Sequence, residues 1–192
     1  IDREGFQLVT QPSAVSDFYD DLLISDIYEA EIKELVRPAT GADQVHIFDH
    51  TRRAATDNLR KAVKSREPAS VIHNDYTDFS APLRLRDLLP DQAETRLQNR
   101  FAIVNVWRSI FGTVETFPMA FCDSTSVDTD DLVAVKRLSN DRIGEIQYAL
   151  HNPMHRWFYF PAMKMDEAAL IKTYDSATDG RARFTIHSAF DD

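Results

Sequence analysis

Cysteine, positive charge and long apolar runs are all scarce in this sequence. Its 192 residues include one cysteine, Cys122, so no disulfide can form within the chain, which fits a reducing cytoplasm. Lys and Arg number 22 against 31 Asp and Glu, and the resulting net charge of −9 repels nucleic acid and anionic lipid. Apolar runs stop well short of the ~20 residues that cross a membrane, and no leader pattern precedes them. We therefore expect a soluble, cytoplasmic protein without nucleic-acid or membrane partners.

The composition indicates a globular chain with one core. The hydrophobic share is 43%, with 12 Phe, 6 Tyr and 2 Trp, as in ordinary folded proteins. No repeat, low-complexity tract or linker is visible, so we expect residues 1–192 to form a single domain. The sequence begins at Ile1 without a Met and ends on SAFDD. We expect native terminal segments to be missing from it.

Helical and loop patterns dominate the first third of the chain. Apolar residues recur at nearly helical spacing after Ser16-Asp17, which predicts a helix over about residues 16–37 packed on the outside of the core. Residues 44–48 alternate like a strand, and the basic, polar segment 50–67 is predicted to be a surface loop. A short helix is predicted over 90–99.

Short strand-like pieces separated by turn residues follow from Pro68 onward. Their number, without long helices between them, predicts a mainly β protein, an antiparallel jelly roll with flanking helices. The predicted strands are 69–75, 100–110, 118–123, 131–137, 144–150, 155–161, 168–176 and 181–187.

The stretch VIHNDYT carries the first candidate site. His73 and Asp75 lie two residues apart, so on an extended strand both side chains face one way and can reach the same ion. A site with two histidines and one carboxylate, as used for iron(II), needs another histidine from a neighbouring strand. The histidines that compete for this place are His50, His151, His155 and His187.

His187 is the best of these candidates. It ends the alternating segment RARFTIH, whose polar members are predicted to share one face, and a polar face inside a barrel needs a polar partner. The first and last strands of a jelly roll also lie side by side. Spacing alone leaves a second interpretation open, in which His73 and Asp75 are a hydrogen-bonded pair at a strand end.

A resemblance that runs through nearly the whole chain favours the metal site. The phrases that carry it are DREGFQLV, SDFYDD, VIHNDYT, RDLLPDQAE, RFAIVNVWR, HNPMHRWFYFP and DEAALIKTYDSATDGRARFTIHSAFDD. The sequence resembles the hydroxylase/desaturase family that includes gibberellin desaturase and asaB-type proteins, which are similar to iron(II)/2-oxoglutarate oxygenases. The resemblance implies a double-stranded β-helix, cupin-like core, iron(II), 2-oxoglutarate and O2, with His73, Asp75 and His187 as metal ligands and catalytic residues.

The chain departs from that family at one point. A basic residue that pairs with the 5-carboxylate of 2-oxoglutarate is expected a dozen or more residues beyond the last histidine, but only five residues follow His187 here, none of them basic. We expect this residue to lie beyond Asp192. The alternative is that the cosubstrate is bound differently.

Five further polar residues are candidates near the metal. Arg108, Asn105 and Arg183 are predicted to help bind the cosubstrate, because a guanidinium can hold a carboxylate through two hydrogen bonds. A surface salt bridge is the competing interpretation for Arg108. Tyr76 and Tyr159 are predicted to contact the substrate, against the alternative of aromatic packing in the core.

The predicted function is oxidation of a small molecule, by hydroxylation or desaturation, in secondary metabolism. Three protein ligands leave adjacent positions on the metal for the 2-oxo acid and for O2. Two other classes stay open: a cupin-like metal-dependent dioxygenase or isomerase that does not use 2-oxoglutarate, and a non-catalytic binding protein with the same fold.

Overall fold

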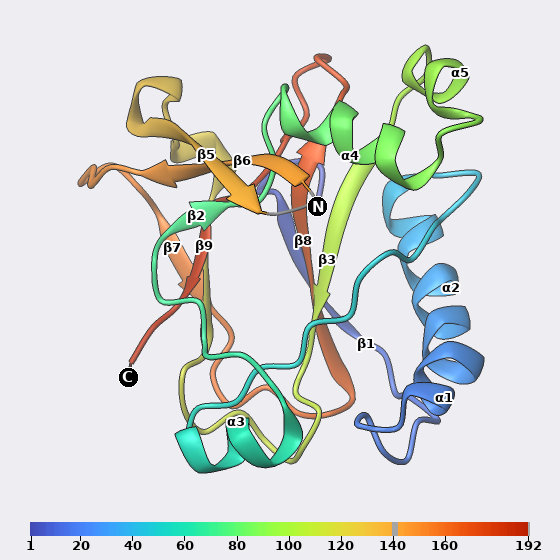
Figure 1. The fold of residues 1–192 in the computed structure, drawn as a ribbon. Coiled ribbons are helices and arrows are strands. Elements are labelled where there is room, and N and C mark those ends of the chain that lie inside the picture. Colours follow the sequence, from blue (N-terminus) through green and yellow to red (C-terminus); the bar gives the residue numbers. More distant parts are fainter. Residues whose placement is uncertain (140–141, 192) are drawn as a thin grey trace.

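Two antiparallel sheets face each other in the computed structural model, which describes residues 1–139 and 142–191 (Figure 1). The smaller sheet has the strand order β1-β8-β3, and the larger one has the order β5-β6-β2-β9-β4-β7. All of the strand pairs are antiparallel. The strands are β1 (Phe6–Thr10), β2 (His73–Asn74), β3 (Ala102–Trp107), β4 (Met119–Cys122), β5 (Leu132–Ser139), β6 (Arg142–Ala149), β7 (Trp157–Tyr159), β8 (Glu167–Asp175) and β9 (His187–Ala189).

The space between the sheets is filled by apolar side chains from both of them. Met119 and Phe121 of β4 pack against Ala169 and Ile171 of β8. Side chains alternate between the faces of a strand, so this contact identifies the inner face of each sheet. The predicted jelly-roll architecture is thereby built around one shared core.

Helices cover the outer face of the smaller sheet (Figure 1). The helical region runs through α1 (Asp21–Leu23), a π-helical segment (Ile24–Tyr28) and α2 (Glu29–Thr40). Its apolar stripe, which includes Ile32 and Val36, packs against Leu170 of β8. The predicted helix is thus present on the outside of the core, although it begins at the Asp20 cap rather than at residue 16 and continues past Pro38 to Gly41.

Three predictions about local structure are wrong, and one helix was missed. Residues 44–48 have irregular backbone, and the predicted loop 50–67 contains helix α3 (Asp57–Val63). The predicted strand 181–187 is a strand only from His187, because its earlier backbone groups bond singly to Asp2 and Lys172 and form no ladder. Helix α4 (Ser80–Leu88) was not predicted, whereas the short helix expected at 90–99 is α5 (Ala93–Leu97).

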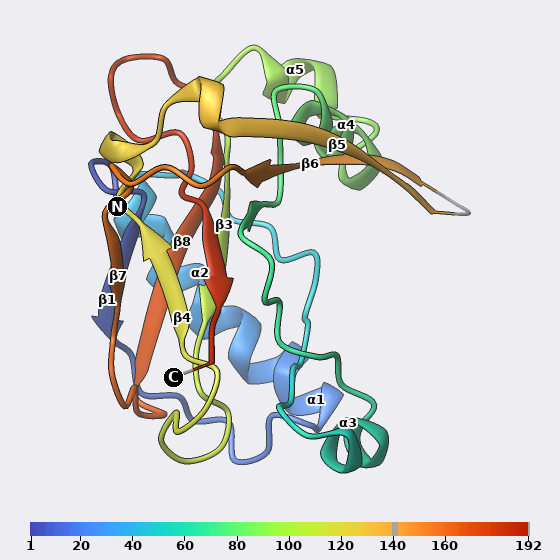
Figure 2. The ribbon, with the colours of Figure 1, turned by 90° about the vertical axis from the view of Figure 1, so that its left-hand side faces the viewer.

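Short 3₁₀ turns complete the described elements, at Ser124–Ser126 and Thr129–Asp131. The hairpin of β5 and β6 extends beyond the body of the molecule (Figure 2). Within the part of the chain that is described, none of the helices is both long and apolar enough to cross a membrane.

Gly5 holds the start of β1 against the segment that leads into β9. Its φ is +89°, and an added Cβ would lie 2.9 Å from Thr185 Cβ and 3.0 Å from the Phe184 carbonyl oxygen. We expect Gly5→Ala to lower the free energy of unfolding by about 2 kcal/mol, through backbone strain and overpacking together. Chemical denaturation measures the change.

Gly180→Ala is the matched control for that prediction. Gly180 has a similar φ of +93°, but a Cβ there would meet nothing within 4 Å. Strain alone should therefore lower its stability by about 1 kcal/mol. Equal losses for the two variants would contradict the close contact inferred at Gly5.

Candidate metal centre

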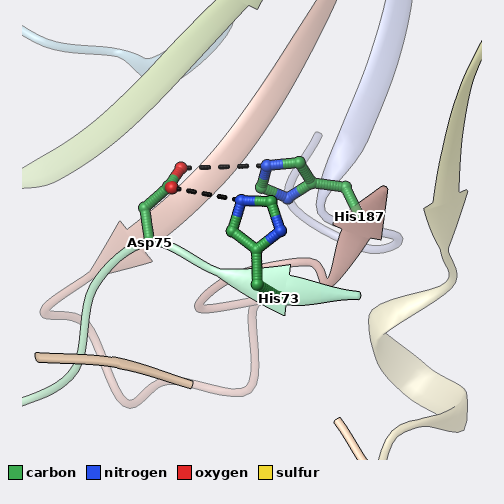
Figure 3. Close-up of side chains that lie close together, drawn as sticks. All are labelled: His73, Asp75 and His187. Carbon is green, nitrogen blue, oxygen red and sulfur yellow. Dashed lines mark ion pairs between the residues drawn. The ribbon is translucent and has the colours of Figure 1, made fainter. Parts of the chain in front are cut away.

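Strand pairing in the larger sheet brings two histidines together. His73 on β2 is paired directly with His187 on β9, so both side chains lie on the same face of the sheet. Their ring centroids are 4.6 Å apart. Asp75 follows β2, and its carboxylate turns back toward both rings (Figure 3). The polar atoms of His73 and Asp75 thus meet those of His187, more than a hundred positions further along the chain.

The three side chains converge through one potential ligand atom each. Asp75 Oδ1 lies 3.5 Å from His73 Nε2, and Asp75 Oδ2 lies 3.8 Å from His187 Nε2. The ligand atoms all lie within 4.8 Å of one another. Atoms about 2.1 Å from a common metal and at right angles to each other would be about 3 Å apart, so small side-chain movements bring these atoms to ligand distance.

Backbone carbonyls orient both imidazole rings. His73 Nδ1 lies 2.7 Å from the carbonyl oxygen of Val71, and His187 Nδ1 lies 3.1 Å from that of Thr185. A carbonyl only accepts hydrogen bonds, so each Nδ1 carries the proton and donates it. Each Nε2 then faces the space shared with Asp75, and once it carries no proton it presents its lone pair there, as metal-binding histidines require.

The charge states of Asp75 and His187 also suit a metal. Burial alone would raise the pKa of Asp75, but its hydrogen bond with His73 and the nearby charge of His187 bring that pKa well below its usual value. Burial lowers the pKa of His187, whereas Asp75 outweighs burial at His73 and raises its pKa. An ionised carboxylate and a neutral buried imidazole are the states that bind a metal ion. The donor set therefore fits the site of two histidines and one carboxylate that holds iron(II).

Asn105 is the other predicted residue that the structure brings to this place. Its side-chain amide donates a hydrogen bond of 2.7 Å to Asp75 Oδ2. Asn105 lies on β3, in the sheet that faces the two histidines. Its position on the same face as Trp107 agrees with the alternation expected from the sequence.

Arg108 and Arg183, which are predicted to bind the cosubstrate, contact other groups in the structure. Arg108 lies beyond Trp107 on the helix side of the sheet, where its guanidinium is 5.5 Å from the ring centre of Tyr28 and donates to the carbonyl of Gln11. The alternation along β3 turns it away from Asn105. Arg183 forms an ion pair with Asp78.

The two tyrosines predicted to contact the substrate pack in different parts of the molecule. Tyr76 packs against a small core cluster that includes Ala81 and Tyr174. Tyr159 pairs with Ala120 of β4, which in turn pairs with Ser188, the neighbour of His187. It therefore faces outward, beside a groove of about 590 Å³ on the opposite side of the sheet from His187. For Tyr76, the contact with this cluster agrees with aromatic packing in the core, the alternative given above.

Sequence reasoning missed two residues near the three side chains. Tyr148 on β6 pairs directly with His73 and shares its face. Arg53 lies in the segment between α2 and β2, which passes from the edge of one sheet to the other (Figures 1 and 2). Its positive charge interacts with Asp75, opposes the rise in the pKa of His73 and adds to the fall in the pKa of His187. Alternation on β6 could have found Tyr148, but no pattern in residues 50–67 relates Arg53 to a site.

Comparison with known proteins identifies the class to which this architecture belongs. A family model described as Oxidoreductase/YMDC permease-like domain matches residues 1–192. The chain is 34% identical to the hydroxylase/desaturase CTB9 of Cercospora beticola, over 99% of this chain and 65% of that protein. It is 32% identical to the hydroxylase/desaturase efuI of Hormonema carpetanum, over 99% of this chain and 71% of that protein.

A solved structure has the same fold as this chain. The iron and alpha-ketoglutarate-dependent endoperoxidase NvfI superimposes with a TM-score of 0.85 and 27% identity, over 99% of this chain and 72% of that one. The chain belongs to this oxidoreductase family of hydroxylase/desaturase proteins, and the predicted family and jelly-roll fold are confirmed. It spans about two thirds of the length of the curated relatives that it matches.

Proposed function

We propose that this chain is the catalytic domain of an iron(II)- and 2-oxoglutarate-dependent oxygenase that hydroxylates or desaturates a small molecule in secondary metabolism. The observation that carries the proposal is the convergence of His73, Asp75 and His187 within 4.8 Å on the inner faces of a jelly roll. Relatives named as alpha-ketoglutarate-dependent and Fe(II)/2-oxoglutarate-dependent dioxygenases support the same cosubstrates here.

We propose that His73, Asp75 and His187 hold the iron, and each has a separate part in doing so. The two imidazoles offer Nε2 because their Nδ1 atoms donate to the carbonyls of Val71 and Thr185. Asp75 supplies the negative charge that balances a divalent ion. Bound iron(II), with 2-oxoglutarate and O2, supplies the oxidising power for attack on a C–H bond, while the protein fixes ligand geometry and positions the substrate.

Positive charge near the three residues favours an anionic cosubstrate. Arg53 is the basic residue whose charge acts on all three of them. Its Nη1 donates a hydrogen bond of 2.6 Å to the carbonyl oxygen of Glu67. This bond fixes the position of the guanidinium. A carboxylate of 2-oxoglutarate or of the substrate would be attracted to this side of the metal.

We also propose that residues 1–192 are one domain acting in the cytoplasm. The core shared by β4 and β8 ties the two sheets together. The single cysteine, Cys122, is buried and free, which agrees with a reducing environment.

The experiment that tests the function is binding of 2-oxoglutarate to the iron(II)-loaded protein without oxygen. A 2-oxo acid that chelates iron(II) gives a metal-to-ligand charge-transfer band, and we expect this band together with a calorimetric binding signal. On admission of O2 and a suitable small molecule, 2-oxoglutarate should be converted to succinate. Mass spectrometry of the product would then separate hydroxylation, a gain of one oxygen, from desaturation, a loss of two hydrogens.

Succinate is the matched control ligand, because it has both carboxylates but no 2-oxo group. It should give no charge-transfer band. If iron binds but 2-oxoglutarate gives neither band nor heat, the activity is that of a metal-dependent dioxygenase or isomerase without this cosubstrate. If iron does not bind at all, the protein is a non-catalytic member of the fold.

A further inference from the structure

Asn105 is a half-buried polar residue beside the apolar core between the sheets. It lies on β3 beside Ile171, which pairs in turn with Phe6. Its nearest companions on this inner face belong to the apolar core cluster between the sheets: Phe6, Leu8, Trp107, Ala169 and Ile171. A primary amide in such a layer loses its hydrogen bonds to water, which is unfavourable unless a partner in the protein replaces them.

The partner of Asn105 is one of the proposed metal ligands. The amide nitrogen reaches from the smaller sheet to the segment that leaves β2 in the larger sheet, and it donates to Asp75 Oδ2 at 2.7 Å. A hydrogen bond to an ionised carboxylate is roughly twice as strong as one between neutral groups. The same bond lowers the pKa of Asp75. Asn105 therefore connects the two sheets at the point where the carboxylate must be held.

Whether Asp75 binds the metal through one oxygen or two decides how many coordination positions stay free. An octahedral ion that takes one atom from each of three protein ligands keeps three positions free, enough for a chelating 2-oxo acid and O2. A carboxylate that bound through both oxygens would occupy one of these. The Asn105 amide engages Oδ2, which lies 3.8 Å from His187 Nε2, and leaves Oδ1, 3.5 Å from His73 Nε2, free of this bond.

We infer that Asn105 is a positioning residue that holds Asp75 as a ligand through a single oxygen and so keeps the third coordination position open. This inference rests on the proposed function and assigns Asn105 a part in it. It differs from the prediction that Asn105 binds the cosubstrate, since the amide acts through Asp75. It also differs from a purely structural amide, whose loss would affect folding and leave the metal unchanged.

Cobalt(II) binding to the wild-type protein and to Asn105→Leu tests the inference. Leucine has the branched shape of asparagine with larger, apolar ends and suits the apolar layer, so the thermal midpoint should stay close to that of the wild type. Calorimetry should show cobalt affinity lower by about 10–100-fold, the usual effect of removing a partner of a metal ligand. The d–d absorption of bound cobalt should change intensity, because it reports coordination number.

Two variants complete the experiment. Asn105→Gln keeps an amide and should recover part of the affinity and of the wild-type spectrum. Asn99→Leu replaces an exposed asparagine whose amide bonds only locally, to the carbonyl of Thr95, and should bind cobalt as the wild type does. Wild-type affinity and spectrum in Asn105→Leu would overturn the inference while leaving the proposed function intact. Failure of the wild type to bind cobalt would overturn both.

Discussion

Asp75→Ala is expected to lower iron(II) affinity by more than 100-fold. The substitution removes one of three proposed ligands and the only anionic one, so the loss should exceed the ~10–100-fold that follows from removing an outer partner. The two histidines would then face each other with ring centroids 4.6 Å apart and without a counter-charge. Anaerobic titration with iron(II), followed by calorimetry, measures the change. Asp75→Asn, which keeps the shape of the side chain, separates loss of the ligand charge from loss of packing.

Asp78→Ala is the matched control for Asp75. Asp78 lies three residues further along the same segment, but its carboxylate pairs with Arg183 and should not contribute to the metal. Among histidines, His151→Ala and His155→Ala serve the same purpose, since His151 is exposed and His155 lies 3.0 Å from Asp131. If either of these variants abolished iron binding while His187→Ala bound normally, the assignment of His187 would be wrong.

Periodicity predicted those elements of the fold whose side chains meet a different environment on each side. The helix after Asp20 has one face in a core cluster, and it was found. Strand β3 was also found, although its two faces meet different core clusters, through Val106 and through Trp107. The alternation at 44–48 gave a wrong prediction of a strand. Val45 and Ile47 do pack against the core cluster under the helix, but from irregular backbone. Helix α4 escaped notice because it packs through a small residue, Ala81, and shows no broad apolar stripe.

The same physics explains which site residues could be found. His73 and Asp75 were found because a two-residue spacing puts both on one side of an extended chain, and resemblance to a family supported His187. Pairing of β2 with β9 could not be derived from spacing, since each strand has only two or three residues. Spacing could not place the Arg108 side chain, because a single further residue along β3 reverses its direction.

Asp175→Asn is expected to lower the free energy of unfolding by about 3 kcal/mol. The Asp175 side chain is 0% exposed, and so is that of Lys172, whose Nζ lies 2.9 Å away. Arg100 bonds to both carboxylate oxygens, at 3.0 and 2.7 Å. Removing one charge from a buried ion pair leaves the other poorly compensated, which typically destabilises a protein by about 3–5 kcal/mol. Lys172 retains Asp2 at 2.5 Å, so the lower end of that range is expected in chemical denaturation.

The difference in free energy of unfolding between the wild type and Asp175→Asn should depend on pH. Burial alone would raise the pKa of Asp175, but Arg100, the backbone N–H of Ala177 and Lys172 outweigh it and lower that pKa. A carboxyl group with a lowered pKa in the folded state stabilises the protein above its ordinary pKa, near 4, and loses this effect as the pH falls through the folded value. This difference in stability should therefore be largest near neutral pH and shrink in acid.

Asp179→Asn is the control, because this exposed carboxylate pairs with Arg181 in solvent and such pairs contribute little. A gap that stayed constant with pH, or an Asp179→Asn effect as large as that of Asp175→Asn, would contradict the stabilising role of the buried pair.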